Sequence, residues 1–140
     1  MQRAFWTSVL LTAALAAGGC DNDLDLPIPD PPVMVTDTFT GNIGVNGAST
    51  HTFVIAAAGR VTAILTELTP DNTVTVGFAL GTWNDTTRIC QQVIPKDTAT
   101  LGEIIVGDTN GPVGGSLCAR IYDTGTLTAG IGYTITVEHP

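Results

Sequence analysis

Basic side chains are scarce in this sequence of 140 residues, which has 5 lysines and arginines against 13 aspartates and glutamates and a formal net charge of −8 at pH 7. Nucleic acids and anionic lipid headgroups are recognised by clustered lysine and arginine, because both ligands carry negative phosphates. The charge balance therefore argues against a nucleic acid partner and against electrostatic binding to lipid headgroups.

Histidine and serine are also scarce. The 2 histidines are His51 and His139, and Ser49 and Ser116 are the only serines after residue 20. Ser49 and His51 are two positions apart and would share one face of a strand, but no glycine-rich nucleophile elbow surrounds Ser49. We interpret both as polar strand positions and expect His139 at a frayed end. The sequence predicts a protein that is not an enzyme.

Clusters of metal-binding side chains are lacking too, and two histidines far apart make a poor zinc site. Candidate calcium ligands are Asp71, Asp85, Asp108 and Asn110, but no EF-hand spacing is present. Aspartate and asparagine are equally typical of β-turns, where they accept hydrogen bonds from their own backbone. We expect turns and no cofactor, with a calcium-dependent module as an alternative.

Long hydrophobic runs are absent after residue 20, and one apolar stretch, residues 4–17, precedes it. About 20 apolar residues are needed to cross a bilayer as a helix, so this stretch is too short for a permanent span. Arg3 before it, and Gly18 and Gly19 after it, complete the pattern of a secretory signal peptide.

The residues Ala17-Gly18-Gly19-Cys20 resemble the lipobox of bacterial lipoproteins. In that family a lipid is attached to the cysteine sulfur, and signal peptidase II cleaves just before it. The resemblance implies a signal peptide over residues 1–19 and a palmitate-type membrane anchor at Cys20. The protein would then lie in the bacterial cell envelope, facing the periplasm or the exterior. The alternative is an ordinary signal peptide cleaved nearby, which would leave Cys20 as an unpaired thiol in an oxidising compartment.

Only 3 cysteines are present. If Cys20 carries the lipid, Cys90 and Cys118 remain as an even pair. Exported proteins meet an oxidising environment, so we predict a disulfide between these two residues. Closing a loop of about 29 residues stabilises a fold by about 3 to 4 kcal/mol on the chain-entropy model.

The composition changes at residue 38. Residues 20–37 are rich in acids and proline and have no helical or strand period, which predicts an extended tether. Residues 38–140 contain short runs of threonine, valine and isoleucine divided by glycine, proline, asparagine and aspartate. This pattern predicts an all-β fold, a jelly-roll-like β-sandwich of about seven to eight short antiparallel strands with almost no helix.

The apolar residues of these runs alternate, so each strand is predicted to turn one hydrophobic face to the core. Further strands are expected over residues 89–94 and 101–106. The expected inward sets are Phe53 and Ile55; Val61, Ala63 and Leu65; Val74, Val76, Phe78 and Leu80; Leu117, Ala119 and Ile121; and Tyr133, Ile135 and Val137.

Two segments, FTGNIGVNGASTHTFVIAAAGRVTAILTEL and GGSLCARIYDTGTLTAGIGYTITVEHP, order their strands and turns in a characteristic way. In this order residues 38–140 resemble the bacterial pre-peptidase C-terminal domain. The resemblance implies a jelly-roll-like, non-catalytic module that assists secretion, substrate engagement or surface attachment.

Trp83 and Tyr122 are the aromatic residues expected to reach the surface. Trp83 is placed in a loop before the disulfide, where its ring could stack on a sugar, fill a partner's pocket or cover one end of the sandwich. Arg120 is expected to pair with a nearby carboxylate at the surface, such as that of Asp123. The sequence predicts a lipid-anchored, non-catalytic binding or adaptor module whose partner is an envelope protein or a glycan. The alternative is a structural envelope protein that packs into a larger assembly.

Overall fold

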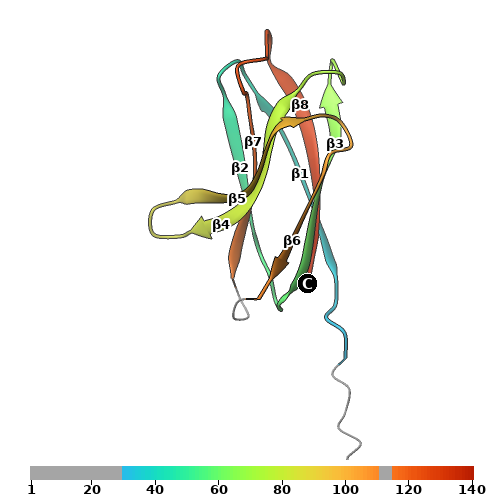
Figure 1. The fold of residues 1–140 in the computed structure, drawn as a ribbon, viewed down its shortest axis with the longest axis vertical. Helices are drawn as coiled ribbons and strands as arrows, with labels where there is room; N and C mark the ends of the chain where they lie inside the picture. Colours follow the sequence, from blue (N-terminus) through green and yellow to red (C-terminus); the bar gives the residue numbers. More distant parts are fainter. Residues whose placement is uncertain (1–29, 111–114) are drawn as a thin grey trace, which may run out of the picture. The chain divides into compact units, whose positions relative to one another are not determined.

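The computed structural model describes residues 30–110 and 115–140 of the protein. The expected signal peptide, Cys20 and the first part of the expected tether lie outside these residues. Within the described ranges the chain has no helix and folds into eight antiparallel strands in two sheets, so the predicted all-β sandwich is confirmed (Figure 1). In particular, these ranges contain no helix long and apolar enough to cross a membrane.

Except for the β4–β5 hairpin, every connection crosses from one sheet to the other. Sheet A has the order β1-β8-β3-β6, with β1 (Val35–Ile43), β8 (Ile131–His139), β3 (Gly59–Thr69) and β6 (Ile104–Thr109). Sheet B has the order β2-β7-β4-β5, with β2 (Ala48–Val54), β7 (Ser116–Tyr122), β4 (Val76–Asn84) and β5 (Ile89–Ala99). Residues 35–37, which the sequence assigns to the tether, pair with β8.

The apolar faces of the strands meet between the two sheets. Val61 and Leu65 of β3, Phe78 of β4, and Ile135 and Val137 of β8 are fully buried and belong to one hydrophobic cluster. Alternation with threonine and other short residues makes one face of each strand hydrophobic, and burial of these faces drives the sheets together. The inward sets predicted from the sequence therefore build the core.

Two strands depart from their predicted bounds. β5 continues past residue 94 through Pro95, which is tolerated because β5 is an edge strand that can spare one N–H group. β6 begins at Ile104 because the preceding residues form a turn. There Gly102 has a φ of 84° and the Glu103 N–H donates to the Thr100 carbonyl at 3.0 Å, a left-handed conformation that glycine adopts without strain.

Candidate binding surfaces

The outer face of sheet B carries Tyr122, one of the two aromatic residues expected to contact a ligand. Leu117, Ala119 and Ile121 of β7 are buried in the core, so the alternate residues of the strand face outward. Tyr122 pairs with Gly77 at one end of β4. Trp83 lies near the other end, so the two aromatic residues are not brought together.

The predicted loop position of Trp83 is wrong. Trp83 belongs to β4 and pairs with Cys90 of β5, in a hairpin whose pairing continues to Asn84 and Ile89. Asn84 closes the turn by accepting hydrogen bonds from two backbone N–H groups of the turn. Because these local bonds close a short turn, the pairing of β4 with β5 continues past Trp83 to the end of the hairpin. Figure 1 shows the hairpin projecting from the sheet.

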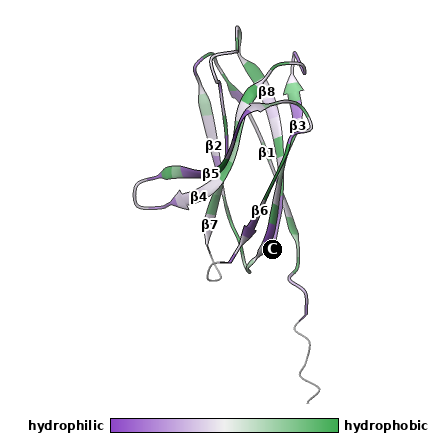
Figure 2. Ribbon diagram, viewed as in Figure 1, coloured by the Kyte–Doolittle hydropathy of each residue, from purple (hydrophilic) through white to green (hydrophobic). Residues whose placement is uncertain are grey.

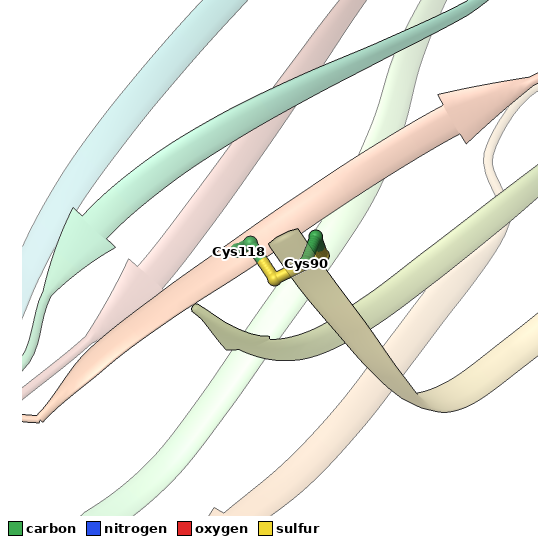
Figure 3. The surroundings of a disulfide bond; sticks show 2 residues. All are labelled: Cys90 and Cys118. Carbon is green, nitrogen blue, oxygen red and sulfur yellow. A yellow bond between two sulfur atoms is a disulfide. The ribbon is translucent and has the colours of Figure 1, made fainter. Parts of the chain in front are cut away.

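The disulfide predicted between Cys90 and Cys118 is confirmed, with a Cα–Cα distance of 5.9 Å (Figure 3). It joins β5 to β7 although β4 lies between them in the sheet. A Cβ atom added at Gly81 would lie 2.2 Å from the Gln91 carbonyl oxygen. The backbone of β5 therefore passes directly over Gly81 on the outer face. Cys118 is fully buried there, even though it points away from the core.

The Tyr122 ring packs over Gly77 of β4, which has no side chain. A Cβ atom added at Gly77 would lie 2.1 Å from the tyrosine ring, and the Tyr122 hydroxyl donates to Asp97 of β5. Burial raises the pKa of Tyr122 to about 12, helped by the hydrogen bond and the negative charge of Asp97, while the Arg120 charge acts in the opposite direction. This hydrogen bond fixes the Tyr122 ring and the Asp97 carboxylate against each other on the outer face.

The raised pKa of Tyr122 predicts a loss of stability at alkaline pH. The unfolded tyrosine ionises near pH 10, whereas the folded one keeps its proton until about pH 12, so this contribution is complete below pH 10 and lost as pH rises toward 12. In a Tyr122→Phe variant we expect the fall in unfolding free energy over this range to be smaller. Urea unfolding at a series of pH values measures it. A Trp83→Phe control, which keeps Tyr122 and removes no titratable group, should retain the full fall, and an equal fall in all three proteins would contradict the assignment.

Arg120 does not form the ion pair expected with Asp123. The Asp123 carboxylate instead accepts hydrogen bonds from backbone N–H groups of two loops. One is that of Asn46 between β1 and β2, and the others are those of Gly125, Thr126 and Leu127 between β7 and β8. These bonds, that of Asn46 first, lower the pKa of Asp123. The carboxylate is already used to join two loops, so the expectation for Arg120 is wrong.

The second surface is the open side of the sandwich, where the edge strands β5 and β6 lie next to each other. The Lys96 ammonium of β5 lies 3.1 Å from the Glu103 carboxylate, just before β6. Between the two strands is an apolar pocket with a volume of about 100 Å³. Its lining includes Val93 and Ile94 of β5, Gly107 of β6, and Val61, Leu80 and Leu117 from the core.

Exposed hydrophobic side chains lie on the same two strands, and of these Val93 lines the pocket. Ile89 and Val93 of β5 are 59% and 62% exposed, and Ile104 and Val106 of β6 are 54% and 46% exposed. Figure 2 shows hydrophobic colouring on the first part of β6 and hydrophilic colouring at its end. This surface is not predicted from the sequence, because the run Ile104 to Val106 is also typical of a strand buried on both faces, whereas here Ile105 alone is buried.

The candidate calcium ligands are not brought together. Asn110 is exposed at the end of β6, and each aspartate has its own partner: the Thr73 N–H and hydroxyl for Asp71, the Ser116 hydroxyl for Asp85 and Arg60 for Asp108. Among the described residues no group of three or more histidine, cysteine, aspartate or glutamate side chains could hold a metal ion. The Asp71 bonds are those of a β-turn.

The two histidines contribute to packing. His51 stacks on Phe39 at 4.8 Å between ring centroids, and its Nε2 lies 2.8 Å from the Tyr133 hydroxyl; burial lowers its pKa. In the described part of the chain no hydrogen bond joins Ser49 to His51. The frayed end expected at His139 is wrong, because this residue is buried in β8 with Nε2 3.1 Å from the Asp37 carboxylate.

Comparison with known proteins shows the fold but no family. No family model matches the chain, and no curated protein matches it, so the resemblance to the pre-peptidase C-terminal domain stays a prediction. The Yersinia pseudotuberculosis-derived mitogen matches with a TM-score of 0.58 and 14% identity, over 77% of this chain and 88% of that one. Aeromonas hydrophila PliG, a periplasmic lysozyme inhibitor of g-type lysozyme, matches with a TM-score of 0.52 and 11% identity, over 73% and 83%. The chain thus shares its β-sandwich fold with two bacterial proteins.

Proposed function

We propose that this protein is a non-catalytic binding module of the bacterial cell envelope, anchored by a lipid at Cys20, which docks an extended segment of a protein partner on its open side. The observation that carries the proposal is the set of exposed apolar side chains on two neighbouring edge strands, beside an apolar pocket. The disulfide supports an exported location, because such bonds persist in oxidising compartments.

The open side is adapted to a polypeptide because its strands end their sheets. An edge strand leaves half of its backbone N–H and C=O groups without a partner in the sheet, and an added strand can pair with them. A pocket beside the edge then selects an apolar side chain of that added strand. A sugar ligand would need a polar lining, whereas this pocket is lined mainly by valine, leucine, isoleucine and glycine.

The first half of β5 is the part best suited to such pairing. The register of β5 against β4 is irregular in both halves, near Val76 and between Leu80 and Gly81, but the second half also contains Pro95, which discourages strand addition. From Ile89 to Ile94 the strand has neither proline nor charged residues. This half also borders the pocket through Val93 and Ile94.

The test uses crosslinking in native cells, with a photo-reactive amino acid in place of Ile104. We expect a distinct envelope protein to be captured, and a Val93→Asp variant to reduce this capture at least tenfold, because a charge in the pocket rim opposes apolar contact. Val54→Asp is the matched control, since Val54 on the far edge strand β2 is also 62% exposed. Equal melting temperatures show that both variants fold.

Two results would overturn the proposal. Undiminished capture by Val93→Asp would remove the open side as the docking surface. Crosslinks that join only copies of this chain would favour the structural alternative, in which the sandwich packs into a larger assembly. The anchor is checked in the same cells, because Cys20→Ala should release the protein from the membrane fraction, and full retention there would contradict lipidation.

A further inference from the structure

Arg120 lies in the middle of the outer face of sheet B, away from the open side. Its neighbours across the strands are Thr50 of β2 and Ala79 of β4. Along β7 it is flanked by Cys118 of the disulfide and by Tyr122. None of these residues lines the pocket between β5 and β6, so this is a separate surface of the molecule.

Among the cations of the described residues, Arg120 combines partial burial with the lack of an ion pair. Arg60 and Lys96 are exposed and lie 3.5 Å and 3.1 Å from the carboxylates of Asp108 and Glu103, and Arg88 is exposed at the hairpin turn. Arg120 is half-buried, yet among the described residues no carboxylate forms a salt bridge with it. Its Nε atom is buried without a hydrogen-bond partner. This is unusual in a chain with 13 acids and 5 basic residues, because buried polar groups are nearly always satisfied.

The nearby acids are held by other groups. The Asp97 carboxylate accepts the Tyr122 hydroxyl, and the Asp123 carboxylate accepts backbone N–H groups of two loops. The Tyr122 ring, fixed by its bond to Asp97, lies with its centroid 6.0 Å from the Arg120 guanidinium carbon. This contact orients the guanidinium but satisfies none of its N–H donors.

We propose that Arg120 is a binding site for one carboxylate group of a ligand on the outer face of sheet B. Because Nε is buried, the carboxylate would meet the two terminal amino groups of the guanidinium, whose N–H donors lie in one plane and match its two oxygens. The hydroxyl of Thr50, on the neighbouring strand of the same face, is a further donor. Ala79 on the other side is fully buried and its side chain carries no group that competes for the guanidinium.

A single carboxylate fits this site better than a phosphate. One cation balances one carboxylate charge, whereas a phosphate dianion would remain partly uncompensated in a protein whose net charge is −8. Two sources offer the same chemistry: an aspartate or glutamate side chain of a protein, and an acidic sugar of a glycan. The test therefore uses one probe for each source.

The experiment follows the Nε–H resonance of Arg120 in the proton–nitrogen NMR spectrum of the full chain during titration with N-acetylglutamate amide, glucuronate and inorganic phosphate. We expect a saturable shift of Arg120 and of the Thr50 amide with at least one carboxylate. The tighter of the two carboxylates identifies the source as protein or glycan. Arg120→Lys keeps the charge but loses the planar donor pair, so it should weaken binding by roughly tenfold or more.

Arg60→Gln is the matched control, because it removes an exposed cation outside this face and should leave the affinity unchanged. Three results would overturn the proposal: no saturable shift with either carboxylate, a loss of binding in Arg60→Gln equal to that in Arg120→Lys, or phosphate binding as tight as that of the carboxylates. The last would mean a site for adventitious ions only. Because Val93→Asp leaves this face intact, its crosslinking result and the titration succeed or fail independently.

Discussion

A variant in which alanine replaces both Cys90 and Cys118 should unfold with a free energy lower by about 3 to 4 kcal/mol. The disulfide joins residues separated by 28 positions in the sequence, and closing such a loop restricts the unfolded chain. The folded state loses a restraint as well. Pairing between β4 and β7 ends at Thr82 and Leu117, so beyond this point the disulfide and the hydrogen bond from the Ser116 hydroxyl to Asp85 tie the hairpin to β7.

Urea unfolding of the oxidised protein and the double variant, followed by circular dichroism, measures this loss. Reduction of the wild-type protein under the same conditions is the control and should reproduce it, because it breaks the bond without removing a side chain. Trp83 provides a second reading. Since it pairs with Cys90, its fluorescence in the folded state should change when the hairpin is released. A loss of unfolding free energy below about 1 kcal/mol would mean that the β4–β5 hairpin is held in place by its other contacts.

The sequence was sufficient for the sandwich because its strands alternate with a period of two. Val61, Leu65, Ile135 and Val137 occupy alternate positions in their strands, and each of them is fully buried. The disulfide was predictable for a different reason, since chemistry and compartment leave few ways to use an even pair of cysteines. The sandwich and the disulfide can both be predicted without knowing which strands are neighbours.

The binding surfaces depend on that missing knowledge. Ile104 and Val106 are exposed because they flank the buried Ile105 and face away from the core on an edge strand, and the run of three apolar residues does not show which of them faces inward. Trp83 was misplaced because Asn-Asp-Thr-Thr reads as a long loop, while Asn84 caps it into a short turn. His139 was misplaced because its partner, Asp37, lies 102 positions away in the sequence. Long-range pairs of this kind appear only once the strands are assembled.

The expectation for Arg120 failed for the same reason, because its surroundings depend on contacts between residues far apart in the sequence. An acid close in sequence, Asp123, made a surface ion pair the natural expectation. The fold instead uses that carboxylate to accept N–H groups from Asn46 and from its own loop, a role visible only when β2 and β7 lie side by side. The guanidinium is thereby left on a sheet face without a counter-charge among the described residues, which is the feature from which its binding role is inferred.

The second large effect is expected from Phe78→Ala, which should lower the free energy of unfolding by about 3 to 5 kcal/mol. Phe78 is among the largest fully buried side chains and lies in β4 between Lys96 of β5 and Ile121 of β7. Its truncation removes apolar burial and leaves a cavity that paired neighbours on both sides cannot close. Such a loss is a large part of the about 5 to 15 kcal/mol that holds an ordinary domain folded.

Two further variants separate the cavity from the loss of hydrophobicity. Phe78→Leu keeps most of the volume and should cost less than half as much as Phe78→Ala, whereas Val54→Ala, at a position 62% exposed, should change the unfolding free energy by less than about 0.5 kcal/mol. Urea unfolding of the three variants at one pH gives the comparison. A loss in Phe78→Ala no larger than that in Val54→Ala would mean that the two sheets do not close over β4. In that case the pocket beside Leu80 and the edge of β5, which are positioned by the same strand, would lose their structural basis as a docking surface.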